Sequence, residues 1–145
     1  MINFQQFLIE IFGSSNIYPW KSIYYNQYRF VTENSDVFVV ELKSYTSNSK
    51  TTWSVSFSNE SISDWNGRMY PASKYSVSTA LKIYNTIADI IKTKIKPYLI
   101  SGDSIYFEAV SARTVPVYSK FASIIAREIG GTIDFSGYSW KVTKL

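Results

Sequence analysis

The chain has 145 residues, and its hydrophobic fraction of 46% is ordinary for a globular protein, so we expect one domain spanning residues 1–145. It contains no cysteine and no histidine, which excludes a disulfide framework, a thiol nucleophile, a Ser-His-Asp triad and a zinc site of the usual kind. The net charge of +4 is uneven: residues 1–72 hold five Lys or Arg and six Asp or Glu, whereas residues 73–145 hold ten and five. A basic half indicates either an anionic partner or a solvated lysine face.

The N-terminal residues predict a short amphipathic helix. Residues 2–12 carry Phe4, Phe7, Leu8 and Ile11 at helical spacing. No run in the sequence reaches the roughly 18 apolar residues of a membrane span, and the first residues lack the basic start of a signal peptide. We therefore expect a cytoplasmic protein without a membrane partner.

Residues 18–27 are rich in aromatic side chains and predict a connection between elements. Trp20, Tyr24 and Tyr25 are candidates for a surface that binds a partner protein, joined by Arg68 from a later loop. The alternative is that these aromatics cover the edge of the core, because aromatic side chains supply large buried area.

Three strands are expected next, at residues 29–33, 36–45 and 51–58. The second and third alternate apolar and polar residues with a period of two, which is the strongest local signal of a strand. We expect an antiparallel meander with one packed face. Residues 60–74 then form a loop long enough for a binding loop or a crossover.

The C-terminal half predicts two helices around one strand, followed by a hairpin. The expected elements are a helix at 76–96, a strand at 104–109, a helix at 116–129, and strands at 132–135 and 138–143. Pro97 ends the first helix, and Gly130 and Gly131 end the second. The predicted order is α-β-β-β-α-β-α-β-β, an α/β (α+β) fold with helices packed on a single mixed, largely antiparallel sheet.

This order and two local motifs resemble a known enzyme family. Residues 105–109 read Ile-Tyr-Phe-Glu-Ala, and Val117-Tyr118 is followed at 129–131 by Ile-Gly-Gly. Over residues 28–143 the layout resembles the Gcn5-related N-acetyltransferase fold. The resemblance implies a meander, a cofactor-binding helix, a strand, a second helix and a closing hairpin.

In that family the pyrophosphate of acetyl-CoA lies at the start of the first of these helices, where glycines let backbone N–H groups approach it. The resemblance places this contact at Ser78, Thr79 and Ala80, and it implies that Tyr118 protonates the departing thiolate. Arg113 lies five residues before Tyr118, so both could meet one anion. The family pattern is Gln/Arg-x-x-Gly-x-Gly/Ala, of which the stretch from Tyr75 keeps only Ala80. We therefore expect a degenerate cofactor loop and no bound cofactor.

A second resemblance concerns the same half of the chain. The pattern Ile-x-Phe-x-Ala at 105–109, followed by Ser111, Arg113 and Tyr118, resembles small uncharacterised proteins of tailed bacteriophages. It implies a viral protein acting in the host cell cytoplasm.

The remaining polar residues form no strong motif. Glu108 shares a strand face with Tyr106 and is a candidate general base if that face is a cleft; the alternative is a surface glutamate. Asp64 and Asp103 are scattered carboxylates, so no metal site is expected. The basic residues that suit a nucleic acid are Lys82, Lys92, Lys94, Lys96, Arg113, Lys120 and Arg127.

These observations favour a non-catalytic accessory protein that acts by binding another protein. Two alternatives stay open. One is an acyl-CoA-dependent N-acetyltransferase that uses Tyr118 and Glu108, and the other is a nucleic-acid-binding protein that uses the basic half. The sequence leaves the oligomeric state open.

Overall fold

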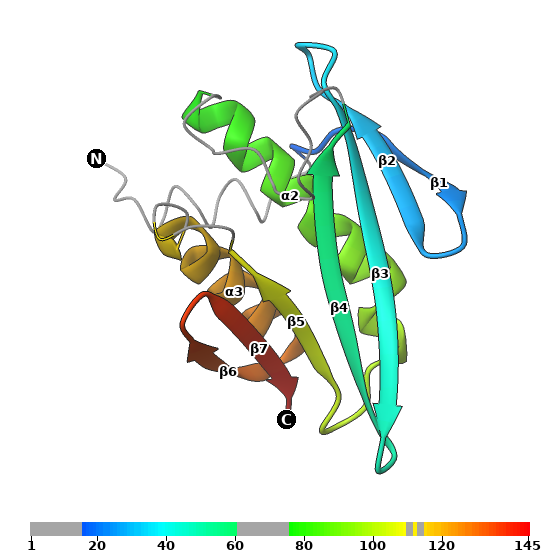
Figure 1. The fold of residues 1–145 in the computed structure, drawn as a ribbon, viewed down its shortest axis with the longest axis vertical. Coiled ribbons are helices and arrows are strands. Elements are labelled where there is room, and N and C mark those ends of the chain that lie inside the picture. The colour runs from blue at the N-terminus through cyan, green and yellow to red at the C-terminus, as the bar shows by residue number, and fades with distance from the viewer. Residues whose placement is uncertain (1–15, 61–75, 110–111, 113–114) are drawn as a thin grey trace.

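A computed structural model describes residues 16–60, 76–109, 112 and 115–145. These residues form one seven-stranded sheet, and both described α-helices lie against the same face of it (Figure 1). The predicted helix at 2–12 and most of the predicted loop at 60–74 lie outside the described residues.

The described elements follow each other in a simple order. The first four strands are β1 (Trp20–Tyr24), β2 (Gln27–Val31), β3 (Val37–Ser47) and β4 (Lys50–Asn59). The helix α2 (Val77–Lys94) and the short 3-10 helix η2 (Lys96–Tyr98) come next. The chain ends with β5 (Ser104–Glu108), α3 (Val115–Ile129), β6 (Gly131–Ser136) and β7 (Ser139–Lys144).

The sheet is mixed and largely antiparallel, as predicted. Its strands lie in the order β1-β2-β3-β4-β5-β7-β6. Every neighbouring pair is antiparallel except β4 and β5, which are parallel because the crossover through α2 returns the chain in the same direction. The predicted crossover is thus confirmed.

The prediction of a connection at residues 18–27 is wrong, because the segment forms an additional strand. Trp20 pairs with Phe30 and Lys21 pairs with Arg29 in an antiparallel hairpin. The register shifts between Ser22 and Tyr24. Such a shift breaks the period-two alternation that would have announced the strand. Four strands therefore precede α2, where the sequence predicted three.

One face of the sheet carries the apolar core. Cross-strand partners share a face, and the buried pairs Val40 with Phe57 and Leu42 with Val55 lie under the helices. The first helix contributes Ile83, Ile87, Ile90, Ile91 and Ile95, and the second contributes Tyr118, Phe121, Ala122, Ile125 and Ile129. The opposite face is polar along β4, where Thr52, Ser54, Ser56 and Ser58 alternate with the core residues.

A buried carboxylate ties the two halves of the sheet together. The Asp103 side chain accepts hydrogen bonds from the backbone N–H of Thr51 at 2.9 Å and of Ile100 at 3.0 Å. Its own backbone carbonyl accepts from Lys144 N at 2.8 Å. Asp103 thus joins the start of β4, the turn before β5 and the end of β7.

Replacing Asp103 by alanine removes the acceptor of two backbone N–H groups. We expect Asp103→Ala to lower the free energy of unfolding in urea by about 2–3 kcal/mol, since each orphaned donor loses its partner. The matched control is Asp134→Ala, whose exposed side chain predicts a change within about 0.5 kcal/mol. Equal effects of the two variants would contradict a clamping role for Asp103.

Candidate functional site

The residues expected to hold a cofactor form the first turn of α2. Ser76 caps the helix, because its hydroxyl oxygen accepts the backbone N–H of Thr79 at 3.2 Å. Ser78 is exposed, whereas Thr79 is buried. The Thr79 hydroxyl donates to Glu33 Oε1 at 2.7 Å. A carboxylate of the protein itself therefore lies at the start of this helix.

Glu33 is held by donors from two directions. The Tyr18 hydroxyl donates to its other oxygen, Oε2. The hydrogen bond from Tyr18, followed by the one from Thr79, lowers the pKa of the Glu33 carboxyl below its ordinary value. The positive end of the helix dipole also favours a negative charge here. The carboxylate is thus stabilised in its charged form.

The Tyr18 side chain that holds Glu33 is itself fixed. Its backbone N–H donates to Thr86 Oγ1 at 2.9 Å, and its ring stacks on Phe30 with 5.8 Å between the centroids. Lys82 Nζ lies 4.4 Å from the centroid of the same ring. Glu33 could not be recognised from the sequence, because a single acidic residue in a turn carries no signal of its distant partners.

The second candidate region lies between β4 and β5. These strands pair only where residues 52–54 face residues 104–106, and beyond this point they separate toward their carboxyl ends (Figure 1). Aromatic side chains fill the space on the helix side. The Tyr118 ring contacts one ring from each strand, with centroid distances of 6.3 Å to Phe57 and 6.1 Å to Phe107.

Tyr118, the predicted proton donor, is a core residue. Only 1% of it is exposed. Its ring also packs on Tyr84 and Trp140, at centroid distances of 5.8 and 5.6 Å. Burial raises the pKa of Tyr118 far above its ordinary value, and the neighbouring Tyr84 adds to the rise. Arg113, its predicted partner, lies outside the described residues.

Glu108, the predicted general base, is exposed at the end of β5. Its Oε1 accepts a hydrogen bond from the Tyr106 hydroxyl. This bond to a carboxylate is the main cause that raises the pKa of Tyr106. Tyr118 belongs to α3 and packs on Phe107, which points to the helix side of the sheet. Glu108 follows Phe107 in β5, so its side chain points to the other side. The structure therefore places the two predicted catalytic residues on opposite faces of the sheet.

The predicted aromatic surface divides into structural and exposed residues. Trp20 is half-buried, and its indole N–H donates to Asp89 Oδ2 on α2 at 2.8 Å. By contrast, Tyr24 and Tyr25 are 73% and 91% exposed at the tip of the β1–β2 hairpin. Arg68 lies outside the described residues.

The hairpin tip borders a shallow hollow of about 400 Å³, which we call the tyrosine hollow. It is lined by Tyr25, Asn26, Gln27, Glu41, Leu42, Lys43, Ser44 and Tyr45. It forms because β2 begins opposite Glu41, whereas β3 runs on beyond the hairpin (Figure 1). Glu41 accepts from Gln27 Nε2 at 2.9 Å and forms an ion pair with Lys43 at 3.2 Å. Tyr45, which no sequence motif singled out, also lines the hollow and is 62% exposed.

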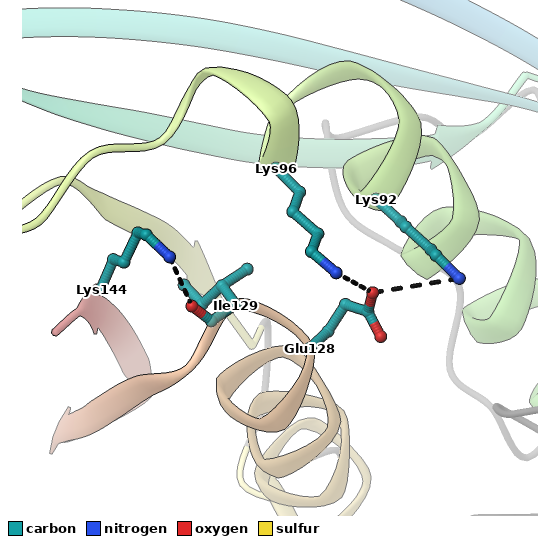
Figure 2. A network of polar contacts seen from close by, with 5 residues as sticks. All are labelled: Lys92, Lys96, Glu128, Ile129 and Lys144. Carbon is teal, nitrogen blue, oxygen red and sulfur yellow. Dashed lines mark hydrogen bonds and ion pairs between the residues drawn. The ribbon is translucent and has the colours of Figure 1, made fainter.

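Several of the lysines that are candidates for binding a nucleic acid instead form contacts within the protein. Glu128 Oε1 on α3 accepts from Lys96 Nζ at 2.7 Å and lies 4.0 Å from Lys92 Nζ (Figure 2). Lys94 Nζ lies 6.0 Å from the Trp20 ring and 5.8 Å from the Tyr28 ring. The ammonium groups near the end of α2 thus contact a carboxylate and two aromatic rings of the protein itself.

The described residues offer neither a cluster of metal ligands nor a helix that could span a membrane. They contain no group of three or more acidic side chains that could hold a metal ion. The Asp103 carboxylate is already engaged by backbone donors, and Asp64 lies outside these ranges. Neither helix in the described part has the length and apolar character that a membrane crossing requires.

Comparison of the chain with protein-family models, with curated proteins and with solved structures finds no match.

The contact between Glu33 and Thr79 predicts a specific dependence of stability on pH. A carboxyl with a lowered folded pKa stabilises the fold above its unfolded value of 4.5, and this contribution is lost as the pH falls through the folded pKa. We expect Glu33→Gln to lower the free energy of unfolding at pH 7 by about 1 kcal/mol or less, since the site is at the surface. The difference from wild type should shrink below pH 4.5.

Urea denaturation from pH 7 to pH 3 measures this effect. Glu60→Gln is the matched control, because Glu60 is also exposed and no described contact involves its side chain. A difference between Glu33→Gln and wild type that stays constant over this range would count against the charged form of Glu33 as the stabilising species.

Proposed function

We propose that this protein is a small accessory module that binds another protein and uses an acetyltransferase-like scaffold without catalysis. The meander, the crossover helix α2, the parallel strand β5, the helix α3 and the closing hairpin follow the layout implied by the family resemblance. This agreement supports the scaffold. The resemblance to tailed-phage proteins supports an origin in a bacteriophage and action in the host cytoplasm.

The contact of Glu33 with the start of α2 carries the argument against catalysis. A helix start that binds a pyrophosphate offers free backbone donors and positive potential. Here the Thr79 N–H is bound by Ser76, and the Thr79 hydroxyl is bound by Glu33. A pyrophosphate at this turn would lie against the carboxylate charge. The buried position of Tyr118 points the same way, because a proton donor must reach its substrate.

The tyrosine hollow is the surface that best suits a protein partner. Tyrosines are enriched in protein interfaces, because they bring a large amphipathic surface at a low entropic cost. Tyr25 and Tyr45 both line the hollow, and a hydrogen bond joins Gln27 and Glu41, two further residues of its lining. This lining of polar groups and aromatic rings fits a polypeptide that makes both apolar and polar contacts.

Titration calorimetry with acetyl-CoA tests the loss of the cofactor site. We expect no saturable heat with the wild-type protein at millimolar cofactor. Glu33→Ala removes the opposing charge, so any binding by this variant alone would identify Glu33 as the obstacle. Saturable binding by wild type, with a dissociation constant well below 1 mM, would instead support the N-acetyltransferase alternative.

Affinity capture from source cells tests the tyrosine hollow. We expect a partner protein that binds the wild type to be retained at least about 10-fold less by a Tyr25→Ala/Tyr45→Ala double variant, since interface tyrosines are frequent hot spots. Tyr98→Ala is the matched control, because Tyr98 is 72% exposed on η2. Equal retention by both variants would reject the hollow as the docking surface. Capture that nuclease treatment abolishes would favour the nucleic-acid alternative.

A further inference from the structure

Strand β6 forms one outer edge of the sheet in the described structure. It pairs with β7 along its whole length, and the backbone N–H of Leu145 donates to the Gly130 carbonyl at 3.1 Å. Hydrogen-bonded and non-bonded pairs alternate along an antiparallel ladder. The backbone groups of Thr132 and Asp134 therefore point to β7. Those of Gly131, Ile133 and Phe135 point outward, where no described strand meets them.

The β6 edge lacks the features that hinder the opposite edge, β1, from pairing with a further strand. Edge strands commonly avoid further pairing through lysines, prolines or bulges. The outer strand β1 carries Lys21 and a register shift between Ser22 and Tyr24. By contrast, β6 pairs with β7 in an unbroken register, and its one charged residue, Asp134, lies opposite Lys141. The β6 edge is regular and nearly neutral.

The same strand exposes apolar side chains at the rim of the core. Ile133 is 39% exposed and Phe135 is 52% exposed. Their cross-strand partners Val142 and Trp140 are buried, so both side chains lie on the face that carries the helices. The Phe135 ring packs 4.9 Å from the Trp140 ring and leaves its outer side to solvent. A further strand beside β6 would cover both residues.

We propose that this strand is a second copy of β6, so that two copies of the chain form a dimer with one continuous sheet. The two strands run antiparallel, with Ile133 opposite Ile133 of the second copy and Gly131 opposite Phe135. This register pairs all three outward-facing residues, and each pair exchanges two backbone hydrogen bonds. A register centred on Asp134 would place two carboxylates opposite each other, which is unfavourable.

The side chains around this register are self-complementary. A Cβ atom on Gly131 would lie 2.6 Å from the Thr143 carbonyl oxygen, so this position admits only glycine beside β7. The Phe135 ring of the second copy would cover the bare backbone that the glycine leaves. On α3, Glu128 faces Lys92 and Lys96 at the end of α2. Successive residues of a helix are rotated by about 100°, so Ser119 lies on the opposite side of α3, away from α2. Ser119 and its neighbours Ser123 and Ala126 are small and uncharged, which lets the two α3 helices approach.

Because the chain has no cysteine, a single introduced cysteine reports on the register. Ile133→Cys should form a disulfide-linked dimer under mild oxidation, since directly opposed Cα atoms lie about 5.5 Å apart. The matched control is Thr132→Cys. In the proposed register its two copies lie roughly 8 Å apart, beyond disulfide reach. Non-reducing electrophoresis at low micromolar protein measures the linked fraction, which we expect to be at least about 10-fold higher for Ile133→Cys.

Sedimentation of the unmodified protein tests the dimer itself. We expect a mass of twice 16.6 kDa that falls toward the monomer on dilution. Phe135→Lys and Ile133→Pro should both sediment as monomers with unchanged circular dichroism, because the Ile133 N–H points away from β7. If one variant fails to fold, the other still gives the answer. A wild-type protein that stays monomeric at several hundred micromolar, or equal disulfide formation at positions 132 and 133, would overturn the proposal.

Discussion

The short parallel pairing of β4 with β5 is the constraint on which the rest of the structure depends. It is the strand pairing that joins the four-stranded meander to the C-terminal three strands, and it covers only residues 52–54 and 104–106. The buried Asp103 carboxylate fixes this junction at the start of both strands. Because α2 must cross between two parallel strands and α3 follows on the same side, both helices bury one face and leave the Ser/Thr-rich face of β4 without a helix in the described structure.

The separation of the two strands beyond this junction creates a space that the core must fill. In a mixed sheet, the carboxyl ends of parallel strands are where ligands commonly bind. Here Phe57, Phe107 and Tyr118 meet in that space, and the start of α2 beside it is bound to Glu33. Thr79 and Tyr118, which the family resemblance assigns to cofactor binding and catalysis, are thus already used in contacts within the protein. This competition between packing and ligand binding is the physical basis of the proposed loss of catalysis.

The two surfaces proposed for association lie on different parts of the sheet. The tyrosine hollow belongs to β2, β3 and the hairpin tip, whereas the dimer edge is β6 at the far end of the strand order. Binding at one therefore leaves the other free. A dimer through β6 would present two hollows to a partner, and a partner with repeated binding segments would bind it with increased apparent affinity.

Local patterns in the sequence determined most of the elements. The extents of α2, β5, α3 and the closing hairpin follow from apolar periodicity, the Ser76 cap and the positive φ of 68° that Gly130 adopts after α3. These signals act between residues close in sequence, so the chain itself reveals them. Strand β1 was missed because its irregular register erases the alternation on which such a prediction rests.

Only the tertiary structure decided what the candidate residues do. The sequence placed Thr79 and Tyr118 in two helices, and both residues lie in helices in the structure. Their roles, however, depend on distant partners. Thr79 bonds Glu33, which lies 46 residues away, and Tyr118 packs on rings from four other elements. The same holds for the aromatic residues of the first hairpin. Trp20 has a structural role because it donates a hydrogen bond to Asp89 on α2, whereas Tyr24 and Tyr25 stay exposed. Sequence periodicity shows which face of an element is apolar, but the packing of distant elements determines which side chains stay accessible to a partner.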